Sequence, residues 1–390
     1  MEVRGQKTEA TSTERIYLDW NATAPVLPAV REAMVRALDE TPGNASSIHR
    51  EGQAARATIE RARRAVARAI GAPPQAVVLT GGATESNNQV LRHHLRTTAN
   101  PSIIGTAVEH PSVLEVLHVL DAEAVPVSIW PVDRQGRLDM DWLEERLDEG
   151  ATLVSVMWAN NEIGNIYPIA DIARRAHEKG ALIHVDGTQA LGRIPVDFDA
   201  AGVDYLTLSF HKMGGPKGIG AIVVREGLKV EALLSGGHQE RGRRPGTENV
   251  PAAAGLEAAA RELHRSGKTW FEHLLELRRG FIEALRAEVP GLELRGDLEA
   301  QLPNTLNVAF PKVDGEDLLL AIDLEGIAAS SGSACTAGSL EPSHVILAMG
   351  FDHDSARQSV RFSFGPSTDP AELREAARRI GRVSTRLRDL

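Results

Sequence analysis

Short runs of β-branched residues alternate with helical patterns between residues 76 and 224, and this alternation restricts the possible fold most strongly. It is typical of a mainly parallel sheet that is covered by helices on both faces. The sequence predicts six strands, at residues 76–80, 102–107, 152–158, 181–185, 205–209 and 220–224. We therefore expect an α/β protein that is built around one central sheet.

Helical patterns precede the first of these strands, separate several of the others and follow the last one. The expected helices cover residues 54–70, 86–95, 112–120, 169–179 and 252–288. Because the last of these is long and short strands resume after Pro290, we place a domain boundary on it. We expect a large domain over residues 16–265, with its first residues as candidates for packing against the small domain. A smaller α+β domain follows over residues 266–390, and polar residues 1–15 are predicted to be a disordered extension.

Composition limits the location and the partners of the chain. Its 390 residues are 42% hydrophobic, which is enough to bury a large core, and no segment is long and apolar enough to span a bilayer. The formal net charge of −10 argues against direct binding to nucleic acid. One cysteine excludes an intramolecular disulfide, and no cysteine and histidine spacing indicates a zinc site. We expect a cytoplasmic protein without a metal.

Polar residues follow the predicted strands at their carboxyl ends, where open α/β sheets bind ligands. The Gly81-Gly82 turn comes directly before a helical pattern, and the amides at such a helix start suit a phosphate group. The other strand ends carry His110, Asn161, Asp186 with Gln189, and Ser209 with His211 and Lys212. Each residue alone has an ordinary explanation, for example as a helix cap, a turn former or a solvated lysine.

Together, these groups match the requirements of pyridoxal 5'-phosphate. This cofactor needs a lysine for its Schiff base, a carboxylate that keeps the pyridine nitrogen protonated, a stacking ring and donors for the phosphate. Lys212, Asp186, His110 and the Gly81-Gly82 turn supply one of each. The sequence therefore predicts a pyridoxal phosphate site at this edge of the sheet.

The single cysteine, Cys335, lies in the segment Ser-Ser-Gly-Ser-Ala-Cys-Thr-Ala-Gly-Ser at residues 330–339. A lone cysteine is more often an inert buried residue. Here its neighbours are small and polar, so they offer little apolar surface to cover a sulfur atom, and they favour a flexible loop. We predict an accessible thiol that acts as a nucleophile.

Longer motifs extend over almost the whole chain. They occur at residues 17–25 (Tyr-Leu-Asp-Trp-Asn-Ala-Thr-Ala-Pro), 82–86, 160–164, 184–186, 211–218, 244–247 (Arg-Pro-Gly-Thr) and 330–343. In these motifs the chain closely resembles the cysteine desulfurases, which belong to the class V aminotransferase family of fold-type I pyridoxal phosphate enzymes. The cysteine segment resembles that of the group related to NifS and IscS, in which the catalytic cysteine lies on a longer mobile loop.

The resemblance implies a role for each matching residue. Lys212 would form the Schiff base and move protons, His110 would stack on the cofactor ring and serve in acid and base steps, and Cys335 would take up sulfur. Arg361 would bind the substrate carboxylate, assisted by Asn161. The cofactor-binding set that the resemblance implies is Lys212, Asp186 at the ring nitrogen, Gln189 at the ring hydroxyl, His110, Asn161, and Thr84, Ser209, His211 and Thr247 at the phosphate. Thr247 would come from the second subunit of a homodimer.

The implied reaction removes sulfur from L-cysteine, releases L-alanine and leaves a persulfide on Cys335. The sulfur would pass to an acceptor protein, such as an iron-sulfur scaffold or a tRNA-thiolation enzyme. A selenocysteine lyase, a cysteine sulfinate desulfinase or another aminotransferase of the family remains an alternative, since the same cofactor site serves all of them. A protein that kept the fold without catalysis is disfavoured, because every charged group of the site is present.

Three positions depart from the pattern of the family. Phe210 replaces a small residue before His211-Lys212, which we expect to change packing under the cofactor. Pro245 stands where a serine is common, in the loop that would reach the phosphate across the dimer. The sequence ends at Leu390, where related proteins often continue into a tail that docks the scaffold, so the acceptor stays open. His344 and the arginines near Arg241 are candidates for favouring the thiolate of Cys335.

Overall fold

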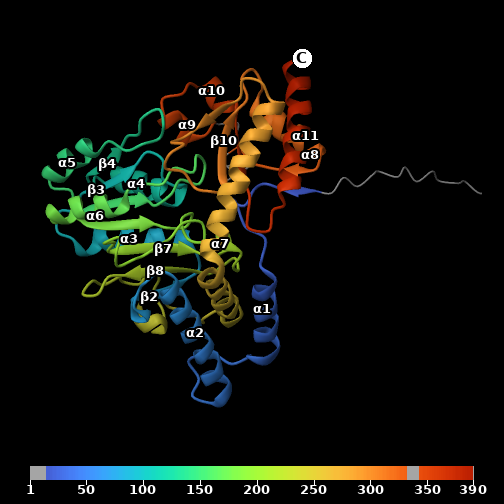
Figure 1. Cartoon of the computed structure of the whole chain (residues 1–390). Coiled ribbons are helices and arrows are strands. Elements are labelled where there is room, and N and C mark those ends of the chain that lie inside the picture. Colours follow the sequence, from blue (N-terminus) through green and yellow to red (C-terminus); the bar gives the residue numbers. More distant parts are fainter. Residues whose placement is uncertain (1–14, 332–341, 390) are drawn as a thin grey trace, which may run out of the picture.

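A seven-stranded sheet forms the centre of the larger part of the molecule (Figure 1). The computed structural model describes residues 15–331 and 342–389. The strand order is β2-β8-β7-β6-β5-β3-β4, with parallel pairing from β7 to β4 and antiparallel pairing of β8 with both neighbours. The strands are β2 (Val77–Thr80), β3 (Ile103–Thr106), β4 (Val127–Trp130), β5 (Leu153–Met157), β6 (Leu182–Asp186), β7 (Tyr205–Ser209) and β8 (Gly220–Val224). The predicted α/β class is confirmed, and all six predicted strands are present.

The sequence prediction missed β4 and the helix that follows it, α5 (Met140–Asp148). β4 is the edge strand of the sheet, and three of its four residues are exposed or half-buried. An edge strand of this kind lacks the continuous apolar run by which a buried parallel strand is recognised.

Helices pack on the sheet through amphipathic faces. In α2 (Arg50–Ala69) the buried positions Ala55, Ile59, Ala62 and Val66 recur every three or four residues, so one stripe faces the core. The other helices of this part are α1 (Pro28–Glu40), α3 (Ala83–Thr97), α4 (Pro111–Ala122) and α6 (Ile169–Glu178), with short 3-10 helices at Pro74–Ala76, His211–Met213 and Gln239–Gly242. The interior strands β5 and β7 are thereby buried at every residue, as strands with both faces covered are.

A second core lies around a three-stranded antiparallel sheet of order β12-β10-β9. Its aromatic residues Phe281, Phe310, Phe362 and Phe364 are fully buried and meet edge to face. The elements here are β9 (Glu293–Arg295), β10 (Thr305–Ala309), α8 (Gly315–Leu324), β11 (Ile327–Ala328), β12 (Ser359–Ser363) and α11 (Pro370–Arg388). Two short helices between β11 and β12, α9 (His344–Ala348) and α10 (His353–Arg357), bury Val345, Ile346 and Ala356 in the core of the large sheet instead. A capping box at Asp369 and Glu372 starts α11.

The long helix α7 (Val250–Glu288) connects the two cores. Its first half buries Ala253 and Leu256 in the core of the seven-stranded sheet, and its second half buries Leu274 and Phe281 in the second core. Figure 1 shows α7 extending from beside α1 to beside α11. The predicted boundary between residues 265 and 266 falls inside this continuous helix, so the domain division stays a prediction.

The beginning of the described chain packs against the second core. β1 (Ile16–Tyr17) pairs in parallel with β11, and Leu18 and Trp20 are buried in that core. The extension predicted at residues 1–15 lies outside the described residues except for Arg15, which forms a surface ion pair with Asp323. Over residues 15–331 and 342–389, no helix combines the length and the apolar character that crossing a membrane requires.

Buried ionisable groups make stability depend on pH. Burial lowers the pKa of His94, His184 and His211 to about 4, so these rings are neutral in the folded protein at pH 5 to 7. Burial raises the pKa of the Glu109 carboxyl to about 8 and raises that of Glu162 as well. Between pH 6.5 and 5 the unfolded chain binds protons at the three histidines, whereas the folded protein holds a proton at Glu109, and the raised pKa of Glu162 acts in the same direction as that of Glu109.

Acidification from pH 6.5 to 5 is therefore expected to lower the melting temperature by roughly a few degrees. The three histidines with lowered pKa values reduce the stability of the folded protein as the pH falls over this range. The two carboxyls with raised pKa values have the opposite effect, and the net change in stability follows the more numerous histidines. Differential scanning calorimetry at both pH values would measure it, and His94→Gln should reduce the dependence. An equal or higher melting temperature at pH 5 would contradict this assignment.

Candidate active site

A cavity of about 650 Å³ opens at the carboxyl ends of the parallel strands. Segments from seven parts of the chain line it, including the turn after β2, the ends of β6 and β7, and β12. Nine of the residues predicted from the sequence meet here: Thr84, His110, Asn161, Asp186, Gln189, Ser209, His211, Lys212 and Arg361. The structure thus brings these side chains together, while the role of each one stays a prediction.

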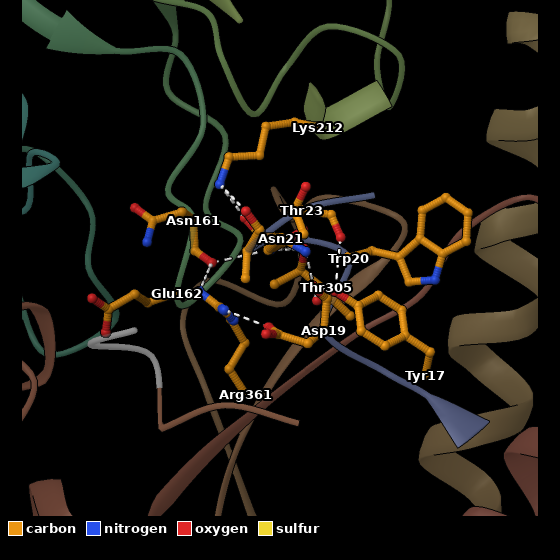
Figure 2. A network of polar contacts seen from close by, with 12 residues as sticks. Tyr17, Asp19, Trp20, Asn21, Thr23, Asn161, Glu162, Lys212, Thr305 and Arg361 are labelled. Atoms are coloured by element: carbon orange, nitrogen blue, oxygen red, sulfur yellow. Dashed lines mark hydrogen bonds and ion pairs between the residues drawn. The ribbon is translucent and has the colours of Figure 1, made fainter. Parts of the chain in front are cut away.

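Lys212 follows β7 and lies in the short helix His211–Met213, which ends at Gly214 in a left-handed conformation with φ of 84°. Its Nζ donates hydrogen bonds to the carbonyl oxygens of Asn21 at 2.6 Å and Ala22 at 2.8 Å (Figure 2). These carbonyls belong to the segment after β1, so the N-terminal part of the chain forms one wall of the cavity. In the sequence, this segment is recognisable only as part of the motif at residues 17–25.

Asp186 ends β6, and two donors hold its carboxylate. Oδ1 accepts from the Thr188 amide at 3.0 Å, and Oδ2 accepts from Asn87 Nδ2 at 2.8 Å. Asn87 also donates to Ser112 Oγ at 2.9 Å. Hydrogen bonds to an ionised carboxylate are stronger than those between neutral groups, so these donors fix the orientation of Asp186. Sequence reasoning missed Asn87, because the buried face of α3 is mostly polar and does not set this asparagine apart from a surface one.

His110 is the N-cap of α4, and its ring orientation follows from that position. Its Nδ1 accepts a hydrogen bond from the Ser112 amide at 3.1 Å, so the neutral ring carries its proton on Nε2. Burial lowers the pKa of His110, with a smaller opposing effect of Asp186. The ring is therefore neutral at pH 7 and connects to Asp186 through Ser112 and Asn87.

The turn between β2 and α3 lines another part of the cavity. Gly82 has φ of 149°, and a Cβ added at Gly220 would lie 2.7 Å from Gly82 Cα, so both backbones pass each other closely. Thr84 follows this turn in the first turn of α3, where backbone amides have no partner within the helix. His211 and Lys217 also line the cavity, and Lys217 was not among the predicted site residues.

An ion pair beside this turn accounts for part of the arginine run at residues 241–244. Arg244 Nε lies 3.0 Å from Glu85 Oε1, and Glu85 Oε2 accepts from the Gly81 amide at 3.0 Å. Thr247, three residues later, is exposed and does not line the cavity of its own chain. Its predicted role at the phosphate of a second subunit stays a prediction.

Two departures from the family pattern have defined positions. Phe210 is 1% exposed and packs in the core of the large sheet without lining the cavity. Pro245 is buried, and a Cβ added at Gly236 would lie 2.8 Å from its ring. The Phe210 ring therefore fills the core beneath the site.

Arg361, on β12, lines the cavity from the side of the second core. Arg361 is 1% exposed, and an ion pair and a hydrogen bond orient its guanidinium group. Nη2 lies 2.7 Å from Asp19 Oδ1, and Nη1 donates to the backbone oxygen of Asn161 at 3.1 Å. Asn161 thus contacts Arg361 through its main chain, whereas the resemblance implies only that Asn161 assists Arg361 at the substrate carboxylate.

Cys335 lies outside the described residues, but both flanks of its segment are placed beside the cavity. On one flank, Ser330 and Arg361 exchange backbone hydrogen bonds of 3.2 and 2.6 Å. On the other, Ser343 caps α9 and donates from Oγ to Glu162, and His344 Nε2 lies 2.9 Å from the carbonyl oxygen of Glu109. Since a carbonyl only accepts, Nε2 of His344 carries a proton in this contact.

The aminotransferase class-V family model matches residues 16–375 of the chain. A cysteine desulfurase of Nostoc sp. (strain PCC 7120) is 43% identical over 96% of this chain and 94% of its own length. The cysteine desulfurase NifS of Azotobacter vinelandii is 39% identical over 96% of this chain and 94% of its own length.

A solved NifS-like protein has the same fold, with a TM-score of 0.90 and 35% identity over 96% of this chain and all of its own. Members of this family depend on pyridoxal phosphate and share the fold-type I architecture, which confirms the fold-type expected from the motifs. Both of these relatives are named cysteine desulfurases. The alternatives of a selenocysteine lyase, a desulfinase or a general aminotransferase are therefore not favoured. On the match over nearly its whole length, the chain belongs to the class V aminotransferase family and, within it, to the cysteine desulfurases.

Proposed function

We propose that this protein binds pyridoxal 5'-phosphate in the cavity and transfers the sulfur of L-cysteine to Cys335. One observation carries the proposal: Lys212, Asp186 and Arg361 line the same cavity, and both flanks of the cysteine segment are hydrogen-bonded beside it. A lysine, a carboxylate and an arginine in one cavity match the amine, ring-nitrogen and carboxylate contacts that amino-acid chemistry on this cofactor needs.

The lining residues fit pyridoxal phosphate. The helix start after Gly81-Gly82 suits the phosphate, and Asp186 suits the protonated ring nitrogen. Two buried oxygen atoms of lining residues, Thr188 Oγ1 and Gln189 Oε1, have no hydrogen-bond partner among the described residues. Leaving such a buried oxygen without a hydrogen bond costs about 1–3 kcal/mol, and a polar ligand that donates to it removes this cost.

The cofactor, when bound, supplies an electron sink that weakens bonds near the substrate nitrogen. Lys212 would hold it covalently through Nζ and later move a proton at the substrate carbon. Asp186, which its two donors orient, would pair with the ring nitrogen. His110 would stack on the ring and exchange a proton at Nε2. Thr84, Ser209 and His211 would bind the phosphate, and Gln189 the ring hydroxyl, with Asn161 beside them.

The sulfur step balances without an added oxidant. The Cys335 thiolate forms a bond to the sulfur of L-cysteine, and the bond between that sulfur and its carbon breaks. The electron pair of the broken bond stays with the carbon skeleton, which takes up protons and leaves as L-alanine. L-cysteine and one thiol thereby become L-alanine and one persulfide.

The small number of residues between Ser330 and Cys335 supports the assignment of Cys335 as the sulfur acceptor. It lies five residues after Ser330, which pairs with Arg361, so it stays within about 18 Å of that anchor even in a fully extended chain. Such a reach allows the thiol to meet the substrate sulfur and also to present a persulfide to a partner. A short tether of this kind raises the effective concentration of the nucleophile at the site.

We further propose a cytoplasmic homodimer that delivers sulfur to an acceptor protein, either an iron-sulfur scaffold or a tRNA-thiolation enzyme. The exposed position of Thr247, away from its own cavity, supports a contribution of this residue to a second subunit. The single cysteine supports a reducing compartment. A monomeric mass in light scattering of the cofactor-loaded protein would contradict the dimer.

The function is tested by product analysis of the purified, cofactor-loaded protein with L-cysteine and a reductant. We expect L-alanine and sulfide in equal amounts, since each turnover breaks one carbon–sulfur bond and the reductant releases the persulfide sulfur. L-serine, which has no sulfur, serves as the control substrate and should release neither product. Cofactor absorbance without alanine would contradict the proposed reaction and leave the family assignment intact.

A further inference from the structure

One short segment of the chain contacts both cations that the proposed function uses. Residues 19–23 run between the second core and the cavity, and Figure 2 shows Lys212 above this segment and Arg361 below it. The carbonyls of Asn21 and Ala22 accept from Lys212 Nζ, and the carboxylate of Asp19 pairs with Arg361 Nη2. The segment therefore links the positions of the two groups that would hold the substrate.

The backbone of this segment is fixed to the strand that carries Arg361. Asp19 forms a parallel bridge to Ser363 on β12, two residues beyond Arg361. The Ser363 amide donates to Leu18 O at 2.8 Å, and Ser363 Oγ accepts from the Asn21 amide at 2.9 Å. Because both side chains start from neighbouring, hydrogen-bonded backbones, the pairing of Asp19 with Arg361 needs little rearrangement.

Further contacts hold the turn that follows Asp19. The Tyr17 hydroxyl lies 2.9 Å from the carbonyl oxygen of Thr23 and 3.2 Å from that of Asp19. Burial raises the pKa of Tyr17, with the nearby Asp19 as the second cause, so the hydroxyl keeps its proton and donates. Asn21 Nδ2 donates to Thr305 Oγ1 at 2.9 Å and to Asn161 O at 3.0 Å. That Asn161 oxygen is also the acceptor for Arg361 Nη1.

The charges explain why Asp19 matters for a buried arginine. The side chain of Arg361 is 2% exposed, and a cation removed from water requires a close counter-charge. Asp19 supplies one at 2.7 Å, and its own side chain is 19% exposed, so the pair is shielded from most solvent. The carboxylate and the Asn161 carbonyl hold Nη2 and Nη1 separately, which fixes the plane of the guanidinium group.

We propose that Asp19 is a positioning residue that orients Arg361 toward the cavity and so sets the affinity for the carboxylate of the amino-acid substrate. This inference rests on the proposed function, in which Arg361 binds that carboxylate. Asp19 acts through Arg361, and the same segment holds Lys212 through main-chain carbonyls, which a side-chain substitution leaves in place.

Asp19→Ala is expected to raise KM for L-cysteine on the order of tenfold while changing kcat less than about threefold, since a tenfold change corresponds to about 1.4 kcal/mol. Asp19→Asn should have a smaller effect, because its amide oxygen accepts from Nη2 without the charge. The matched control is Asp323→Ala, which breaks the other ion pair of this N-terminal region, with Arg15 on the surface. The control should leave both constants unchanged.

Binding measured by cofactor absorbance separates orientation of Arg361 from general damage. Asp19→Ala should weaken binding of L-alanine about tenfold but leave binding of cysteamine unchanged, because cysteamine has the amine and the thiol without the carboxylate. Equal weakening of both ligands, or no weakening of L-alanine, would overturn the proposal. If the wild-type protein makes no alanine from L-cysteine, the proposed reaction fails, and the comparison of L-alanine with cysteamine still tests Asp19.

Discussion

Cys335→Ala is expected to lower alanine formation from L-cysteine at least about a hundredfold and to abolish the protein-bound persulfide. Cys335 is the one cysteine of the chain, so no other protein thiol is present to replace it as the nucleophile. The cofactor absorbance should stay at the wild-type level, because the variant keeps Lys212 and Asp186, the groups that would hold the cofactor. Alanine release and persulfide labelling, measured on the same samples, test both statements.

The control for Cys335→Ala is Thr336→Ala, the neighbouring position of the same segment. Thiol titration of the native protein should count one reactive group in the wild type and in the control, and none in the variant. Alanine formation at the wild-type rate by Cys335→Ala would exclude Cys335 as the sulfur acceptor. The family assignment, which rests on the whole chain, would be unaffected.

Lys212→Ala is expected to remove the visible absorbance of the lysine-bound cofactor and to lower alanine formation at least about a thousandfold. The variant loses both the amine that binds the cofactor and the group that moves protons at the substrate carbon. The melting temperature should change little, because Nζ contacts two backbone carbonyls at the cavity wall and fills no core position. Absorbance spectroscopy, a coupled alanine assay and calorimetry measure the three effects.

Lys179→Ala is the matched control for Lys212→Ala, since Lys179 forms a surface ion pair with Asp148 away from the cavity. Surface pairs of this kind contribute about 0–1 kcal/mol, so absorbance and rate should equal those of the wild type. An unchanged spectrum in Lys212→Ala would contradict the assignment of Lys212 as the cofactor lysine. A lost spectrum in both variants would point to a general loss of the fold.

Much of the fold follows from local patterns in the sequence. The strands β5, β6 and β7 are almost fully buried and mainly apolar, and the periodic stripe of α2 matches the helical repeat, so both element types were predictable. β4 escaped prediction because an edge strand that is half exposed has no such run. Pairing of β1 with β11 joins residues far apart in the chain, and no local pattern encodes that contact.

The residues of the site also fall into those that local sequence patterns indicate and those that they do not. Polar residues at the strand ends were visible in the sequence, since each one directly follows an apolar run, and their chemistry indicated the cofactor. Asn87 was missed because a buried asparagine in a helix has the same local appearance as a surface one. Its importance comes from Asp186, which is 99 residues away and lies 2.8 Å from its amide nitrogen.

The sequence by itself determined the order of strands and helices, the polar groups at the carboxyl ends of the strands and the type of chemistry that they allow. Only the tertiary structure decided which partners orient those groups. Asp19 and Arg361 are 342 positions apart, and they meet because residue 19 pairs with Ser363 on β12. Such partners depend on long-range strand pairing and burial, which the folded chain sets as a whole and which no local run of residues specifies.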